Sequence, residues 1–137
     1  MRGVLTAIPV LLTAIVLMGM GSLGGPPEGT VPKTSENIKA QIVDRSGVST
    51  ELSRFSMDGN VFFKGKLGAG EMSVLFHDLE EISFGPASGE EVPADLLLKS
   101  GARHQLKVHK SAVFYGDTGY GAFNISAHDV SRIIFRK

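Results

Sequence analysis

Two ionisable pairs, His77-Asp78 and His128-Asp129, are the residues of this chain whose types and spacing could do chemistry. Imidazole and carboxylate groups are both ligands of Zn²⁺, so four such groups could hold one ion if the fold brought the two pairs together. A hydrolytic His-Asp dyad is not indicated, because its members normally converge from separate elements. One hypothesis is therefore a metal-binding protein or metal-dependent enzyme that uses these pairs.

A structural role explains the same residues more economically. Asp78 and Asp129 are placed to cap a single helical turn by accepting hydrogen bonds from its free amides, and each histidine then stands half-exposed at a strand end. His104 and His109 are five residues apart on an expected strand, which sends their side chains to opposite faces. Cysteine is absent, and neither GxSxG, HExxH nor a phosphate-binding glycine loop occurs. We therefore expect no enzyme, no cofactor and no metal.

The His-Asp pairs belong to a longer repeat. Residues 70–84, GEMSVLFHDLEEISF, recur as residues 121–135, GAFNISAHDVSRIIF, without a gap and at a constant offset of 51. The similarity extends backwards, with Val61-Phe62-Phe63 matching Val113-Phe114-Tyr115 at a slightly different offset. This pattern predicts an internal duplication.

Each copy reads as a series of short strands separated by turns. Strands are expected at 41–44 and 50–57, and Asp58-Gly59-Asn60 has the residues of a tight hairpin turn. The next strand opens at Val61 and is expected to break at Gly65, Gly68 and Gly70. Alternating apolar residues at 72, 74 and 76 indicate a half-buried strand. A helical turn and a short strand complete the unit.

This order of elements resembles that of small barrels of the SH3-like and Sm-like kind, although no peptide-binding aromatic set or RNA-contact motif accompanies it. We expect an all-β protein of two duplicated units of about five strands, residues 39–85 and 94–137, joined by a connector at 86–93. Units of about 45 residues bury little surface alone, so the two barrels should pack together. One pseudo-symmetric β-sandwich is the alternative.

The N-terminal segment predicts export. Residues 1–21 carry a single charge, Arg2, then an apolar run and small residues, which is typical of a helical signal peptide. An uncleaved anchor in the inner membrane is the alternative, since the run approaches the ~20 residues that span a bilayer. Residues 22–38, rich in Gly and Pro, are expected to be a flexible linker. The protein should therefore be periplasmic or extracellular, and would touch a membrane only through an uncleaved N-terminal segment.

Two aromatic pairs are candidates for partner binding: Phe62 with Phe63, and Phe114 with Tyr115. Adjacent strand residues point to opposite faces, so one member of each pair should be in the core and the other could meet a partner or the second unit. The 14 basic residues balance the 14 acidic ones, which gives no footprint for nucleic acid. The expected function is a non-catalytic binding or structural module of the cell envelope, whose partner is another envelope protein or a second copy.

Overall fold

The computed structural model describes residues 29–136, which form an all-β fold. The expected signal peptide and residues 22–28 of the expected linker lie outside these residues. Residues 31–137 form one compact unit. In the part of the chain that the structure describes, no helix has the length and apolar character to cross a membrane.

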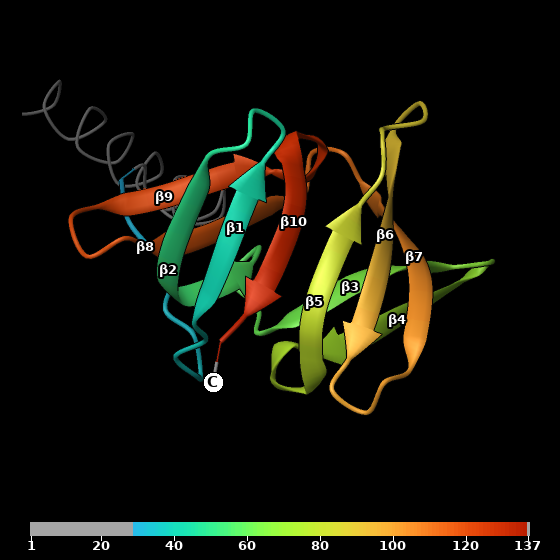
Figure 1. The fold of residues 1–137 in the computed structure, drawn as a ribbon, viewed down its shortest axis with the longest axis horizontal. Coiled ribbons are helices and arrows are strands. Elements are labelled where there is room, and N and C mark those ends of the chain that lie inside the picture. The colour runs from blue at the N-terminus through green and yellow to red at the C-terminus, as the bar shows by residue number, and fades with distance from the viewer. Residues whose placement is uncertain (1–28, 137) are drawn as a thin grey trace, which may run out of the picture. The chain divides into compact units, whose positions relative to one another are not determined.

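Ten antiparallel strands make up one curled sheet (Figure 1). The first five are β1 (Ala40–Asp44), β2 (Ser49–Met57), β3 (Phe62–Leu67), β4 (Gly70–Leu75) and β5 (Leu79–Phe84). The second five are β6 (Glu91–Leu98), β7 (Arg103–His109), β8 (Val113–Asp117), β9 (Ala122–Ser126) and β10 (Val130–Phe135). Single 3-10 turns, η1 (Phe76–Asp78) and η2 (Ala127–Asp129), precede β5 and β10. The strands expected from the sequence at 41–44 and 50–57 are confirmed as β1 and β2.

The strand order is symmetric: each strand of the first five stands as far from one end of the sheet as its counterpart in the second five stands from the other end. The order is β4-β3-β7-β6-β5-β10-β1-β2-β8-β9, so its centre lies between β5 and β10. Ile82 of β5 and Ile133 of β10, equivalent in the sequence repeat, pair directly at this centre. Antiparallel neighbours related in this way are typical of a two-fold arrangement.

Pairings also recur between equivalent residues. The β1–β10 pair Ala40↔Phe135 has its counterpart in Ala94↔Phe84 of β6–β5. The β3–β4 pair Phe63↔Val74 has its counterpart in Phe114↔Ile125 of β8–β9. Phe63 is thus equivalent to Phe114, at the same offset as the rest of the repeat, and the alignment of Val61-Phe62-Phe63 with Val113-Phe114-Tyr115 is wrong by one residue.

The two sets of strands exchange their central hairpins, so two separate small barrels do not form within residues 29–136. The turn at 58–60 is a tight turn as expected, with Asp58 and Gly59 at φ 52° and 88° and Met57 bridged to Asn60. Beyond this bridge the strands part, and β3 pairs with β7 while β2 pairs with β8. A shared core results, which is closer to the single pseudo-symmetric unit of the alternative.

The sequence predicted that Gly65 breaks its strand, but Gly65 lies buried inside β3. A Cβ there would stand 2.9 Å from Leu106 Cβ and 3.1 Å from the Lys107 carbonyl oxygen. At the equivalent Gly116 of β8, a Cβ would stand 2.7 Å from Leu52 Cβ. Both glycines lie where an exchanged hairpin meets its neighbour, so their missing side chains permit the exchange.

A cluster of phenylalanines joins the two sets of strands in one core. Phe55 and Phe114 stack at a ring-centroid distance of 5.7 Å, and Phe63 and Phe114 at 6.3 Å. Phe84 meets Phe114 edge-on at 5.9 Å, and Phe76 stacks on Phe135 at 5.1 Å.

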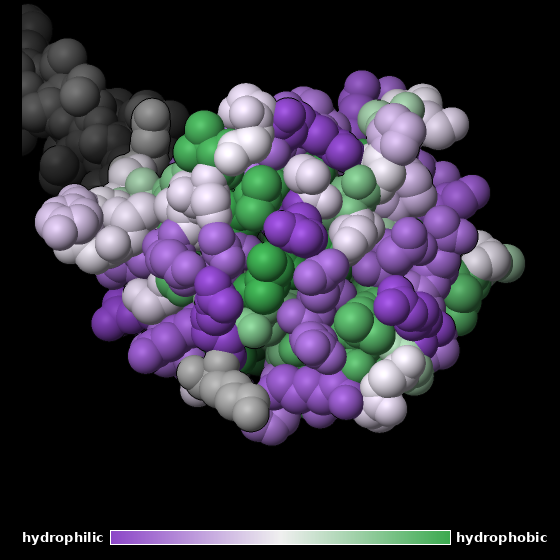
Figure 2. Space-filling view, in the orientation of Figure 1, coloured by the Kyte–Doolittle hydropathy of each residue, from purple (hydrophilic) through white to green (hydrophobic). Residues whose placement is uncertain are grey.

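On the face shown in Figure 2, hydrophobic residues lie scattered among hydrophilic ones rather than in one continuous patch.

The expected aspartate caps are wrong, although the helical turns exist. Each turn begins three residues earlier than an aspartate cap requires, so Asp78 and Asp129 are its last residues, and neither turn has a side-chain cap hydrogen bond. The backbone carbonyls of these residues matter instead, since Asp78 O accepts from Lys99 N–H and Asp129 O from Arg45 N–H, both at 2.9 Å. Both aspartate side chains are exposed.

The turn after β1 provides a test of pH dependence. Asp44 Oδ1 accepts from Ser46 Oγ at 2.6 Å, Ser46 N–H at 2.8 Å and Val48 N–H at 3.0 Å. These donors, the Ser46 hydroxyl foremost, hold the pKa of Asp44 below its ordinary value of 3.8 despite slight desolvation. Because the folded-state pKa is lowered, the ionised carboxylate stabilises the fold at pH values above the unfolded-state pKa. This stabilisation is lost as the pH falls through the folded-state pKa.

We therefore expect Asp44→Asn to unfold at lower urea concentration than the parent chain near neutral pH, with the difference shrinking below about pH 4. Urea unfolding at about pH 7 and about pH 3 measures this. A difference of the same size at both values would contradict the role given to the ionised carboxylate.

Candidate functional site

The two His-Asp pairs do not meet. In the antiparallel β5–β10 pair Ser83 lies opposite Arg132 and Glu81 opposite Ile134, so the start of each strand faces the end of the other. His77 and His128, just before these starts, therefore lie at opposite ends of the central strand pair. The two-fold arrangement brings the strand centres together, not the histidines. Across residues 29–136, no group of three or more His, Asp or Glu side chains could hold a metal ion.

The surroundings of the two histidines differ. His128 Nδ1 lies 3.0 Å from Lys110 O and its Nε2 lies 3.4 Å from Asp129 Oδ1. His77 instead lines a cavity of about 480 Å³ together with Lys39, Lys99 and Phe135. Near His128 the guanidinium of Arg45 donates to the carbonyls of His128, Phe84 and Gly85. Lys99, the counterpart of Arg45, has no hydrogen bond or ion pair from its side chain among the described residues.

Arg45→Met should therefore lower the free energy of unfolding by about 1–2 kcal/mol, because three carbonyl oxygens lose a charged donor. Lys99→Met at the counterpart position is the matched control and should change stability by less than about 0.5 kcal/mol. Urea unfolding of both variants makes the comparison. Equal losses would show that the hydrogen bonds from the Arg45 guanidinium add nothing to stability.

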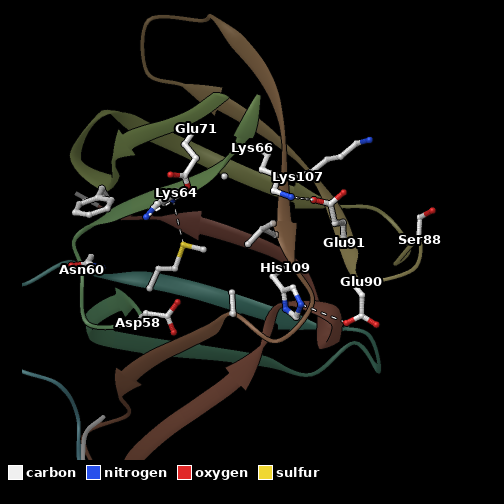
Figure 3. Close-up of a pocket in the computed structure, with 15 residues that line it drawn as sticks. Asp58, Asn60, Lys64, Lys66, Glu71, Ser88, Glu90, Glu91, Lys107 and His109 are labelled. Atoms are coloured by element: carbon white, nitrogen blue, oxygen red, sulfur yellow. Dashed lines mark hydrogen bonds and ion pairs between the residues drawn. The ribbon is translucent and has the colours of Figure 1, made fainter. Parts of the chain in front are cut away.

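The aromatic candidates separate as expected into buried and half-buried members. Phe63 and Phe114 are fully buried in the core. Phe62 and Tyr115 are half-buried, on β3 and β8 respectively. Phe62 borders a groove of about 640 Å³ beside β3, which we call the β3 groove (Figure 3).

The β3 groove exists because β7 is shorter than its counterpart β2. β2 has nine residues and stays paired with β8 as far as Met57, after a shift in register between Ser53 and Ser56. β7 has seven residues, ends at His109 and pairs with β3 at Lys66↔Lys107 alone. The chain then turns, with Lys110 N–H donating to Glu90 O and Ala112 N–H to His109 O. Among the strands of residues 29–136, none therefore lies beside residues 62–64 of β3 on this side.

One backbone group on this open edge has a poor partner. Lys64 N–H points to Met57 Sδ at 3.4 Å, the contact drawn beside Lys64 in Figure 3. A thioether sulfur is a weak acceptor compared with a carbonyl oxygen. Lys64 therefore presents a backbone donor that a better acceptor could take over.

Apolar and charged side chains line the groove in different places. Met57, Phe62, Val108 and Ala112 supply apolar surface. Three lysines and four carboxylates supply the polar lining, namely Lys64, Lys66, Lys107, Asp58, Glu71, Glu90 and Glu91, so the charge is nearly balanced. Figure 3 shows Lys66 and Glu91 in contact across it, with Nζ and Oε2 3.2 Å apart.

His109 on the groove wall has neighbours that resemble a Ser-His-carboxylate set. Its Nδ1 lies 2.6 Å from Ser111 Oγ, and its Nε2 lies 3.5 Å from Glu90 Oε2. However, Ser111 N–H also donates to Nδ1 at 3.1 Å, and all three side chains are exposed. A base occupied by a backbone donor and open to water is poorly placed to activate a hydroxyl. These contacts instead stabilise the chain reversal that follows His109 and ends β7.

A family model described as an uncharacterised protein matches residues 34–137 of the chain. The chain belongs to this family. The matched segment contains all ten strands and every residue of the β3 groove. Neither the curated proteins nor the solved structures contain a significant match.

Sequence reasoning on this family member missed the groove, except for Phe62. Its apolar lining includes Met57, which ends the strand expected at 50–57, and Ala112, to which the sequence analysis gave no role. The available signal was the spacing of the two copies, because Ala40 lies further in the sequence from its counterpart Ala94 than Phe63 lies from Phe114, so the first copy is longer between these residues.

Proposed function

We propose that this protein is a non-catalytic binding module of the cell envelope that holds a protein partner in the β3 groove. The observation that carries the proposal is the groove itself: an open hollow with apolar surface and a charge-balanced rim. Such a lining fits a polypeptide better than a polyanion, which needs a concentrated basic surface. Phe62, half-buried at the groove, supplies an aromatic contact of the kind enriched at protein interfaces.

The export and duplication of the chain belong to the same proposal. Residues 1–21 support an exported protein, held to the inner membrane where the segment stays uncleaved. The palindromic strand order and the recurring pairings support duplication of a five-strand unit that resembles a small barrel. Divergence of the copies then explains how a groove could open on one side only.

Site-specific photo-crosslinking in cells tests the proposal. A photoreactive amino acid replaces Phe62 in the groove, and the control replaces Tyr120, which is fully exposed at the tip of the β8–β9 hairpin. We expect the Phe62 position to crosslink to one envelope protein, and the Tyr120 position not to. Lys66→Glu, which reverses the charge opposite Glu91, should reduce that crosslink. Equal crosslinking at both positions, or recovery in the cytoplasm only, would overturn the proposal.

A further inference from the structure

The β3 groove and its counterpart differ in one respect that indicates what the groove binds. In the second half of the sheet, the edge of β8 is covered by β2, through Ser53↔Asp117, Ser56↔Tyr115 and Met57↔Phe114. In the first half, the described strands cover the equivalent edge of β3 only through Lys66↔Lys107. The molecule thus contains both a covered and an uncovered version of one edge.

The covered edge of β8 shows how the backbone groups on the uncovered edge of β3 can find hydrogen-bond partners. Tyr115 of β8 is equivalent to Lys64 of β3, and Tyr115 pairs with Ser56 of an extended segment. Val113, the counterpart of Phe62, accepts a backbone hydrogen bond from Asp58 N–H at 2.9 Å and donates to Asp58 Oδ1 at 3.3 Å. On the β3 side the place of this segment is the groove.

We infer that the β3 groove binds an extended peptide segment of a partner protein, which adds to the sheet as a strand beside residues 62–64. This rests on the proposed function and names the form of the partner. A carbonyl oxygen of the peptide takes the Lys64 N–H from Met57 Sδ, because a carbonyl is the stronger acceptor. Strand addition gives affinity through the backbone and specificity through alternate side chains.

The side-chain requirement follows from the same comparison. Met57, opposite Phe114, is 5% exposed and points into the core. The peptide residue opposite Phe63 takes the equivalent inward position, beside the side chains of Val108 and Ala112 that line the groove. The inward residue is therefore apolar, and its two neighbours in the peptide face outward toward the charged rim.

A peptide that copies residues 53–58, SRFSMD, is the probe, since this sequence covers the equivalent edge in the chain itself. We expect saturable binding to the purified full chain in mild detergent, measured by NMR, with slower hydrogen exchange of the Lys64 amide. Methylation of the peptide nitrogens that face β3, or replacement of its methionine by aspartate, should weaken binding by about tenfold.

Lys64→Pro removes the N–H on the protein side, and Lys64→Ala, which keeps it, is the matched control. We expect Lys64→Pro to weaken binding by about tenfold and Lys64→Ala to leave it unchanged. If Lys64→Pro does not fold, the comparison of the methylated peptide with the parent peptide still tests strand addition. Equal binding of the methylated and parent peptides, or dimers of the full chain that exclude the peptide, would overturn strand addition. A Phe62 crosslink to a partner that is insensitive to Lys64→Pro would overturn strand addition while leaving the proposed function standing.

Discussion

Phe114→Ala should lower the free energy of unfolding by about 3–5 kcal/mol, the largest effect expected of a single substitution here. Phe114 is fully buried and lies at the centre of the aromatic cluster, where its ring contacts those of Phe55, Phe63 and Phe84. Phe55 and Phe114 are nearly parallel, with an interplanar angle of 8°, so truncation removes stacking as well as apolar burial. Because these rings come from β2, β3, β5 and β8, both sets of strands should lose stability together.

Urea unfolding followed by two probes measures this effect. Tyr120→Ala is the control, because its side chain is fully exposed and the change should cost less than about 0.5 kcal/mol. We expect one cooperative transition in both variants, with a lower midpoint for Phe114→Ala alone. Two separate transitions in the parent chain would contradict a shared core and favour two independent units.

Gly116→Ala should cost about 1–3 kcal/mol although it adds a single methyl group. The new Cβ would lie 2.7 Å from Leu52 Cβ and 2.8 Å from Leu52 Cδ1. Since Leu52 Cβ is held by the β2 backbone, relief requires β2 and β8 to move apart at the hairpin exchange. Gly65→Ala at the equivalent crossing should also destabilise, since its Cβ would meet Leu106 Cβ at 2.9 Å.

Gly121→Ala is the matched control for both glycines, because a Cβ there meets nothing within 4 Å and the residue does not need positive φ. It should leave stability unchanged or raise it slightly by restricting the unfolded chain. Thermal and urea unfolding of the three variants give the comparison. If Gly121→Ala destabilises as much as Gly116→Ala, strand flexibility rather than close approach explains the glycines.

Much of the local structure was predictable because it depends on neighbours in the sequence. Asp58-Gly59 tolerates positive φ, so the turn could be placed from residue type alone. Alternation predicted which residues are inward, and Val74 and Phe76 are buried as expected. Alternation fails at Leu79 and Ile82, which are three apart and both fully buried, because a register shift between Leu79 and Glu81 turns the strand.

The roles of the polar candidates were less predictable. Asp78 looked like a cap because its residue type suits one, but the 3-10 turn begins at Phe76, whose burial positions it. The hypothesis of a shared metal site required His77 and His128 to meet, yet the antiparallel β5–β10 pair places them at opposite ends. The type of a side chain shows which interactions it can make. Only the register of the strands decides which other side chains lie close enough to make them.

The sequence by itself determined the all-β class, the positions of several strands and turns, and the repeat centred on the His-Asp pairs. Tertiary structure alone decided which strands are neighbours. Alternation specifies the buried face of a strand but not the strand that lies along each edge, since backbone hydrogen bonds are the same for every partner. The hairpin exchange, the close approach at Gly65 and Gly116, and the uncovered edge of β3 all depend on that choice of neighbour.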